Sequence, residues 1–225
     1  MDNVIICAAG TGSRIGLNKP KCLIEICGKP IIYWQLDVLE DYKNIVIVVG
    51  FKGDEVIKTV LKRRKDVIFV ENRDYATTNT LDSLRLGAKE VVGPFISLDG
   101  DLLVLPQSLE LLEKAPLPCL GIKLTYSENP VCVRLVEENN KLLAVEFTRE
   151  ILEYEWTGLT KISQEHLFKA DKNNYIYQAL EHFLPLECVI IDCYEIDTLE
   201  DLHGAELWMK KQILSGNFGR NAMKL

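Results

Sequence analysis

The alternation of short apolar runs with segments of helical periodicity is the feature that most limits how this chain can fold. Runs rich in valine and isoleucine predict strands at residues 4–8, 45–49, 67–71 and 95–98. Helical periodicity between them predicts helices at residues 30–41, 54–64 and 81–92. Strands that are apolar throughout are typical of a parallel sheet buried on both faces. We therefore expect an α/β protein with a three-layer α/β/α, Rossmann-like fold and a mostly parallel central sheet.

The second half of the chain is less regular. Its apolar runs predict strands at residues 119–124, 131–136, 142–147 and 189–193. A long helix is predicted at residues 198–214, with Thr198 as its N-cap. No internal repeat or low-complexity linker divides the sequence, and 225 residues are few for two α/β domains. We expect one domain, residues 1–225, with a tail at 215–225 that is frayed or used in a subunit contact.

Charge and composition exclude several classes of function. The chain carries 26 lysines and arginines against 33 aspartates and glutamates, a net charge of −7. No basic excess is available to bind a nucleic acid or an anionic membrane, and no run approaches the roughly 20 apolar residues of a membrane-spanning helix. The seven cysteines lack zinc-site spacing, so we interpret them as reduced thiols of a cytoplasmic protein.

A loop suited to binding an anion follows the first predicted strand. Its residues are Ala8, Ala9, Gly10, Thr11, Gly12, Ser13 and Arg14, followed by Lys19, Pro20 and Lys21. The glycines allow a tight turn whose N–H groups point at a phosphate. Arginine adds a two-pronged phosphate contact, and the lysines add point charges. The segment therefore predicts binding of a phosphorylated ligand.

Two common nucleotide motifs fit this loop less well. A dinucleotide-binding GxGxxG loop would need a third glycine where Ile15 stands, and Pro20 interrupts the segment where its helix should begin. A GxxxxGK[ST] motif is absent from the sequence. A Rossmann oxidoreductase that binds NAD(P) remains an alternative to the function considered below.

The run AAGTGSRIGLNKPKCLIEICGKPII, residues 8–32, resembles the signature of nucleoside-diphosphate-sugar pyrophosphorylase-like nucleotidyltransferases. The resemblance is closest to the phosphocholine and inositol-1-phosphate cytidylyltransferases. It implies that residues 8–12 wrap the nucleotide. Arg14 and Lys21 would hold the triphosphate and act in catalysis. For the adjacent Lys19, a solvated surface charge with no part in binding is the alternative. Residues 1–101 would form the nucleotide-binding half and residues 102–214 the acceptor-binding half.

The same resemblance implies a Mg²⁺ site made of Asp101 and Asp197. Asp101 follows the strand predicted at 95–98, and Asp197 lies in a segment, YEIDTLED, that resembles the closing motif of the family. The carboxyl ends of parallel strands are where α/β sheets bind ligands, and carboxylates suit Mg²⁺. Asp99 is the second choice, and either aspartate taken alone fits a helix cap or turn equally well.

Further site residues are carried over from the family with alternatives left open. Asn79 and Ser83 would lie near the base or ribose, or simply begin a capped helix. Trp156, Gly158 and Arg134 are candidates for binding the acceptor. Tyr126, Tyr154 and Trp156 could form a cage for a quaternary ammonium, although ordinary half-buried aromatics explain them more simply.

The resemblance implies transfer of a nucleoside monophosphate, CMP from CTP in the favoured case, to a small phosphorylated metabolite with release of pyrophosphate. The partners would be the nucleoside triphosphate and that phosphorylated small molecule, and the protein is a candidate homodimer. A sugar-1-phosphate nucleotidyltransferase using UTP, GTP or dTTP is the runner-up. The three histidines form no arrangement for covalent catalysis with serine or cysteine.

Overall fold

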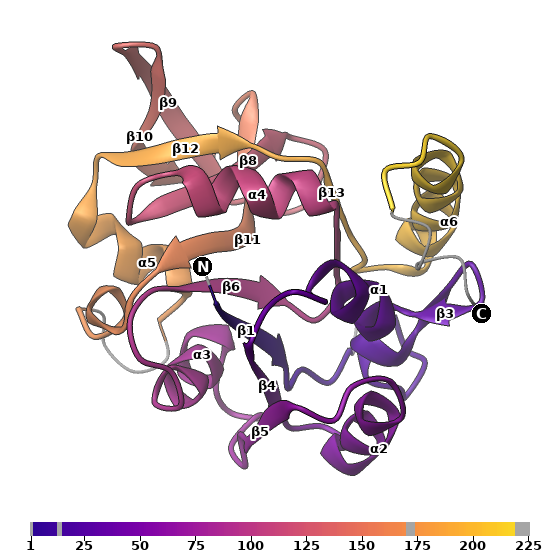
Figure 1. Cartoon of the computed structure of the whole chain (residues 1–225). Helices are drawn as coiled ribbons and strands as arrows, with labels where there is room; N and C mark the ends of the chain where they lie inside the picture. The colour runs from indigo at the N-terminus through magenta and orange to yellow at the C-terminus, as the bar shows by residue number, and fades with distance from the viewer. Residues whose placement is uncertain (1, 13–14, 170–173, 219–225) are drawn as a thin grey trace.

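The computed structural model describes residues 2–12, 15–169 and 174–218. Nine strands form its central sheet (Figure 1). Their bounds are Asn3–Ala8 (β1), Asn44–Val49 (β4), Val67–Glu71 (β5), Phe95–Asp99 (β6), Cys119–Leu124 (β8), Cys132–Glu138 (β9), Lys141–Thr148 (β10), Tyr154–Ile162 (β11) and Leu186–Ile190 (β12). The strand order is β5-β4-β1-β6-β11-β8-β12-β10-β9.

The pairing divides this sheet into two parts. Strands β5, β4, β1 and β6 are all parallel, as the continuous apolar runs predicted. Strand β11 then runs antiparallel to both β6 and β8, and β10 runs antiparallel to β12 and β9. β8 and β12 are parallel to each other. The sheet is therefore mixed, with β10 and β11 opposed to the direction of the other strands, and the predicted Rossmann-like fold class is confirmed.

Helices cover both faces of the sheet (Figure 1). Their bounds are Ile31–Val38 (α1), Gly53–Arg63 (α2), Thr80–Ala88 (α3), Pro106–Lys114 (α4), Ile176–Leu180 (α5) and Leu199–Leu214 (α6). Because neighbouring strand residues point to opposite faces, Val4 and Ile6 of β1 join one core cluster with α1, α2 and α4. Ile5 joins the other cluster with α3 and α5. Short 3₁₀ turns lie at Lys21–Leu23, Gln164–Leu167 and Glu181–Phe183.

Two small antiparallel ribbons complete the fold and support α6. Strand β2 (Glu25–Ile26) pairs with β3 (Lys29–Pro30), and β7 (Leu102–Val104) pairs with β13 (Cys193–Glu195). The single strand predicted at 189–193 is thus wrong. The chain leaves β8 after Ile191, whose N–H still donates to Ile122, and the backbone of Asp192 instead bonds to α4 through Ser108 and to its N-cap Leu105.

The last helix begins where the sequence predicted. Thr198 caps α6, and its side chain and that of Asp201 form a reciprocal capping box. The beginning of the tail is packed rather than frayed, because Phe218 is buried and meets Trp34 edge-on at 5.4 Å between ring centroids. Residues 219–225 lie outside the described residues. Within the described part of the chain, every helix is too short or too polar to cross a membrane.

Candidate active site

A cavity of about 320 Å³ opens at the carboxyl ends of β1 and β6. This is the edge at which parallel α/β sheets bind ligands. Its walls come from the glycine-rich loop, the start of α3, the turn after β6 and the ribbon strand β13. The lining residues are Cys7, Ala8, Gly10, Thr11, Gly12, Lys21, Cys22, Thr80, Asp99, Gly100, Asp101, Glu195 and Asp197.

The glycine-rich loop forms one wall of this cavity. Gly12 adopts a φ of +62°, and a Cβ there would lie 3.1 Å from Cγ of Lys21, so the glycine lets the lysine stem pack against the loop. Ala8, Gly10 and Thr11 line the cavity, whereas Ala9 is buried beside it and accepts a hydrogen bond from the N–H of Phe51. The predicted catalytic Arg14 lies outside the described residues.

Lys21 links the loop to two aspartates from distant parts of the chain. Its Nζ donates a hydrogen bond of 2.7 Å to Oδ2 of Asp101 and another to Oδ1 of Asp197. Burial alone would lower the pKa of Lys21, but the charges and hydrogen bonds of Asp101 and Asp197 outweigh it and raise the pKa. The lysine is therefore a cation at neutral pH, positioned between the two carboxylates.

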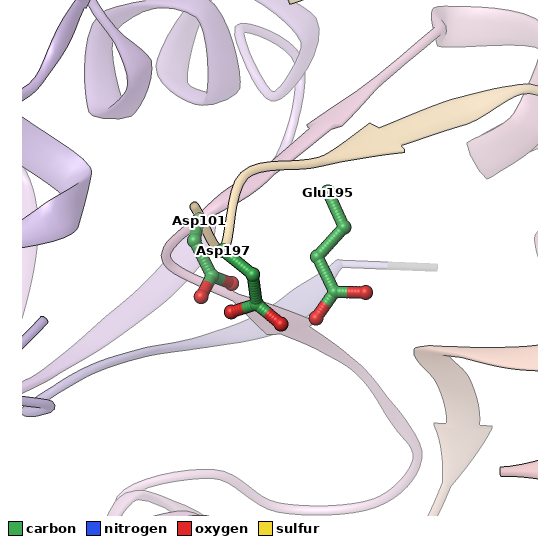
Figure 2. Close-up of side chains that lie close together, drawn as sticks. All are labelled: Asp101, Glu195 and Asp197. Atoms are coloured by element: carbon green, nitrogen blue, oxygen red, sulfur yellow. The ribbon is translucent and has the colours of Figure 1, made fainter. Parts of the chain in front are cut away.

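Three carboxylates converge at this point (Figure 2). One oxygen each of Asp101, Glu195 and Asp197 lie within 4.8 Å of one another. The pairing of Glu195 with Leu102, and a hydrogen bond from the N–H of Ile196 to the carbonyl of Asp101, bring the two segments together. Burial and the nearby aspartates raise the pKa of Glu195. This set of oxygen donors and its excess negative charge fit a hard divalent cation such as Mg²⁺.

Asp99 is placed differently from the other acids. It lines the cavity but is not part of the three-carboxylate cluster. Burial, followed by the charge of Asp101, raises its pKa. Gly158, on the neighbouring strand β11, packs against it: a Cβ there would lie 2.5 Å from Oδ2 of Asp99, and the glycine has a φ of +82°. Gly158 is thus required by the position of Asp99.

Replacing Gly158 with alanine is expected to destabilise the fold and disturb the site. The left-handed backbone alone should cost about 1–3 kcal/mol of unfolding free energy, and the new methyl group must displace the carboxylate of Asp99. Gly93→Ala is the matched control, because Gly93 has a φ of +84° with no atom within 4 Å of a built Cβ. Urea unfolding and turnover should separate the two variants; equal losses in both would rule out the contact with Asp99 as the cause.

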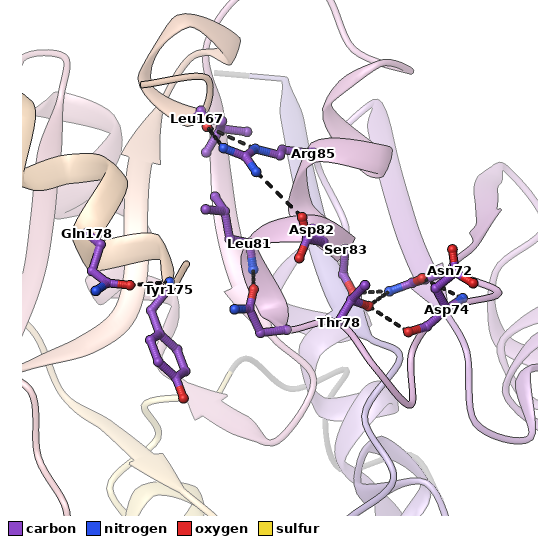
Figure 3. A network of polar contacts seen from close by, with 11 residues as sticks. Asn72, Asp74, Thr78, Leu81, Asp82, Ser83, Arg85, Leu167, Tyr175 and Gln178 are labelled. Atoms are coloured by element: carbon purple, nitrogen blue, oxygen red, sulfur yellow. Dashed lines mark hydrogen bonds and ion pairs between the residues drawn. The ribbon is translucent and has the colours of Figure 1, made fainter. Parts of the chain in front are cut away.

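The predicted base or ribose contacts lie at the start of α3 but outside the cavity lining. The side chain of Asn79 caps the helix by accepting from the N–H of Leu81. Ser83 is buried and accepts a 2.9 Å hydrogen bond from the amide of Asn72, which also donates to Thr78 (Figure 3). These side chains stabilise the loop between β5 and α3. Thr80, the first residue of α3, lines the cavity.

Two of the side chains predicted to contact the acceptor interact with other residues outside the cavity lining. Nε1 of Trp156 donates to Oγ1 of Thr160 at 2.9 Å, and its ring meets Phe147 edge-on. Arg134 is on the edge strand β9, where it forms ion pairs with Glu146 and Glu150. Neither residue lines the cavity, and their part in acceptor binding stays a prediction.

The cysteines of the cavity are not suited to covalent catalysis. Burial raises the pKa of Cys7 well above its ordinary value and that of Cys22 to about 12. Nucleophilic cysteines need the thiolate form, so both groups are neutral thiols at physiological pH. Their place in the cavity is that of small apolar wall residues, in keeping with the interpretation of the cysteines from the sequence.

Glu195 is the main site residue that the sequence reasoning did not select. The signal was present, because residues two apart on an extended chain face the same side and Glu195 precedes Asp197 by two positions. Thr80 was missed for a different reason. The neighbouring Asn79 was predicted to contact the nucleotide, but its side chain caps α3, and Thr80 lines the cavity instead.

Comparisons with known proteins found a matching family profile, related sequences and similar folds. The profile of the MobA-like NTP transferase domain matches residues 4–118. The bifunctional protein GlmU of Methanococcus vannielii is 29% identical over 83% of this chain and 44% of its own length. A CMP-5'-(3-aminopropyl)phosphonate synthase of Streptomyces rubellomurinus is 33% identical over 50% of this chain and 19% of its own. The chain thus spans less than half the length of these curated relatives.

The inositol-1-phosphate CTP transferase from T. maritima has a similar fold, with a TM-score of 0.76 and 21% identity over 94% of this chain and 96% of its own. Fold and site together define a nucleotidyltransferase domain. Because the matching profile covers half of the sequence, the chain belongs to the MobA-like NTP transferase domain family.

Proposed function

We propose that this protein is a Mg²⁺-dependent cytidylyltransferase, which transfers CMP from CTP to a small phosphorylated metabolite and releases pyrophosphate. The observation that carries the proposal is the position of Lys21. Its ammonium lies between Asp101 and Asp197 and beside a glycine-rich loop that opens into the same cavity. A phosphate-binding loop, a half-buried cation and a cluster of carboxylates are the parts that transfer between two anions requires.

The chain's own groups would bind the triphosphate from two sides. Gly10 leaves the loop backbone open to phosphate oxygens, since no atom lies within 4 Å of a Cβ built there. Lys21 would shift its hydrogen bonds from the aspartates toward the α-phosphate, where negative charge increases during transfer. Arg14 is proposed as a second phosphate contact on the basis of its sequence position.

Asp101, Asp197 and Glu195 are the residues that would hold the metal ion. When bound, Mg²⁺ supplies positive charge that neutralises phosphate oxygens of both substrates. The metal ion that these carboxylates would hold, together with the positive charge of Lys21, explains how a cavity with so many acidic groups could accept an anionic ligand.

The attacking group needs no catalytic base. A phosphate monoester has a second pKa of about 6, so the oxygen that would attack the α-phosphorus is already anionic at neutral pH. The neutral thiols of Cys7 and Cys22 and the absence of a base among the cavity residues other than carboxylates are consistent with this reaction. The chemistry would depend on positioning and charge neutralisation.

The choice of CTP is supported by a structural neighbour and a relative. The structural neighbour is an inositol-1-phosphate CTP transferase, and the relative is a CMP-5'-(3-aminopropyl)phosphonate synthase. A sugar-1-phosphate nucleotidyltransferase with another triphosphate is the second candidate, and it is supported by the similar fold of a UDP-glucose pyrophosphorylase, with a TM-score of 0.74.

Pyrophosphate release tests the proposal. The protein is assayed with Mg²⁺ against CTP, UTP, GTP, ATP and dTTP, each combined with phosphocholine, aminoethylphosphonate, inositol 1-phosphate and several sugar 1-phosphates. Release that requires CTP and one acceptor is the expected result. Release with UTP or dTTP and a sugar 1-phosphate would establish the second candidate, and the lack of any triphosphate binding would contradict both.

A further inference from the structure

A buried lysine lies next to the proposed active site without taking part in it. Lys123, near the end of β8, is 5% exposed, and Glu155, near the start of β11, is 2% exposed. Nζ of Lys123 lies 3.4 Å from Oε1 of Glu155, donates a 2.7 Å hydrogen bond to the hydroxyl of Tyr126, and lies 3.9 Å from the centre of the Tyr126 ring. We call these three residues the Lys123 cluster.

The Lys123 cluster lies beside the strand that brings Glu195 to the cavity. The ring of Tyr126 packs against the ring of Tyr194, with 5.9 Å between centroids, and Tyr194 directly precedes Glu195 in β13. On β11, Glu155 lies three residues before Gly158, which packs against Asp99. Tyr126 itself is 51% exposed. The cluster therefore lies close to Glu195 in the chain segment of β13 and close to Gly158 in the chain segment of β11.

Its composition is that of a site for an organic cation. An aromatic ring together with a buried carboxylate attracts a ligand ammonium group, and a buried glutamate requires a cationic partner. Here the chain supplies that cation itself. Burial alone would lower the pKa of Lys123, but Cys193, Tyr126 and Glu155 together raise it above its ordinary value.

We propose that Lys123 occupies the place that a cationic group of the acceptor would take, and that the acceptor is a hydroxylated phosphate without a cationic group. This inference rests on the proposed nucleotidyl transfer and narrows its substrate class to compounds such as polyol phosphates and sugar 1-phosphates. An acceptor ammonium would meet the positive charge of Lys123 and find Glu155 already paired.

The remaining polar groups suit a hydroxylated ligand. The hydroxyl of Tyr126 accepts from Lys123, which leaves its own hydrogen to be donated to a ligand oxygen. Ser127 donates a 2.9 Å hydrogen bond to Oε1 of Glu155, the same oxygen that Lys123 approaches. The position for a cationic group is thus assigned to the Lys123 cluster and not to the aromatic cage of Tyr126, Tyr154 and Trp156 considered from the sequence.

The test compares acceptors in the wild type and in Lys123→Ala. The wild type should use inositol 1-phosphate or a sugar 1-phosphate with a kcat/KM at least about 100-fold above that for phosphocholine. Lys123→Ala should reduce this preference by about tenfold or more, because Glu155 then lacks its partner. Lys161→Ala is the matched control: Lys161 is on β11, the strand of Glu155, but it donates to the carbonyls of Glu113 and Ala115 at the other end of that strand, so its loss should leave the preference unchanged.

A binding measurement keeps this inference separate from the proposed function. Tetramethylammonium chloride, compared with sodium chloride, should raise the melting temperature of Lys123→Ala and leave that of the wild type and of Lys161→Ala unchanged. Lys123→Met, which keeps the apolar stem, should respond in the same direction and serves if the alanine variant does not fold. Efficient use of phosphocholine by the wild type, or no response of either variant to tetramethylammonium, would overturn the inference. Absence of turnover with every acceptor would instead count against the nucleotidyl transfer, while the melting measurement still decides the role of Lys123.

Discussion

Replacing Lys21 with methionine is expected to lower kcat by about 10²- to 10³-fold, the usual effect of removing one preorganised donor to a developing negative charge. Lys21 is a half-buried cation between Asp101 and Asp197, and both raise its pKa against the effect of burial. Methionine keeps the length of the stem that packs on Gly12. The loss should therefore appear in kcat measured by pyrophosphate release at saturating substrates, with a smaller change in KM.

Lys19→Met is the matched control for this variant. Lys19 belongs to the same short segment, and its carbonyl, rather than its side chain, lies against Gly12. Its replacement should change kcat by less than about tenfold. Melting temperatures of both variants establish that they are folded. Turnover of Lys21→Met close to that of the wild type would show that Lys21 lacks the catalytic role that the family signature implies.

Replacing Asp197 with asparagine is expected to weaken the use of Mg²⁺ and to lower kcat/KM by about 10³-fold at a fixed Mg²⁺ concentration. The change removes one of the three carboxylates that lie within 4.8 Å of one another, and it also removes one of the two acids bonded to Lys21. Metal affinity depends on the number of charged oxygen ligands. The Mg²⁺ concentration for half-maximal activity should therefore rise, and high Mg²⁺ should restore part of the rate.

Glu200→Gln gives the matched control for Asp197. Glu200 is an exposed acid in the first turn of α6, three residues farther along the chain. Its loss should leave the Mg²⁺ dependence unchanged. Isothermal titration with Mg²⁺ in the presence of a non-hydrolysable triphosphate provides the measurement without turnover. An unchanged Mg²⁺ titration for Asp197→Asn would contradict the assignment of this aspartate to the metal site.

The parallel half of the fold could be predicted from the sequence because each strand there is both buried and continuous. Strand β5 was predicted with its observed bounds, and β1, β4 and β6 to within one residue at either end. The helices were overextended at their carboxyl ends: α3 ends at Ala88, and Gly93, with a φ of +84°, lies in the turn that follows. Apolar residues in such turns continue the helical pattern without continuing the helix.

The second half could not be predicted as well, because its pairing is not local in sequence. Strand β11 was missed although it lies between β6 and β8 in the sheet. It contains charged and polar residues, among them Glu155 and Thr157, whose burial depends on partners that the sequence does not reveal: Glu155 pairs with Lys123, and Thr157 donates to the carbonyl of Gly121. A segment of this kind does not show the apolar pattern of a buried strand.

Parts of the candidate site followed from spacing, and others required the structure. Asp101 and Asp197 were selected because each follows an apolar strand within a family motif, and the structure brings their carboxylates together with Lys21. The burial of Asp99 against Gly158 depends on the adjacency of β6 and β11, which could not be predicted because these strands are far apart in the sequence.

The fate of the phosphates of CTP tests the central claim most directly. Two preparations of CTP, one labelled at the α-phosphorus and one at the γ-phosphorus, are incubated with the protein, Mg²⁺ and the acceptor found in the pyrophosphate assay. Nucleotidyl transfer predicts that the α label appears in the acceptor product and the γ label only in pyrophosphate. A γ label in the acceptor product would mean phosphoryl transfer, and an α label only in free CMP would mean hydrolysis; either result would contradict the account given for Lys21, Asp101 and Asp197.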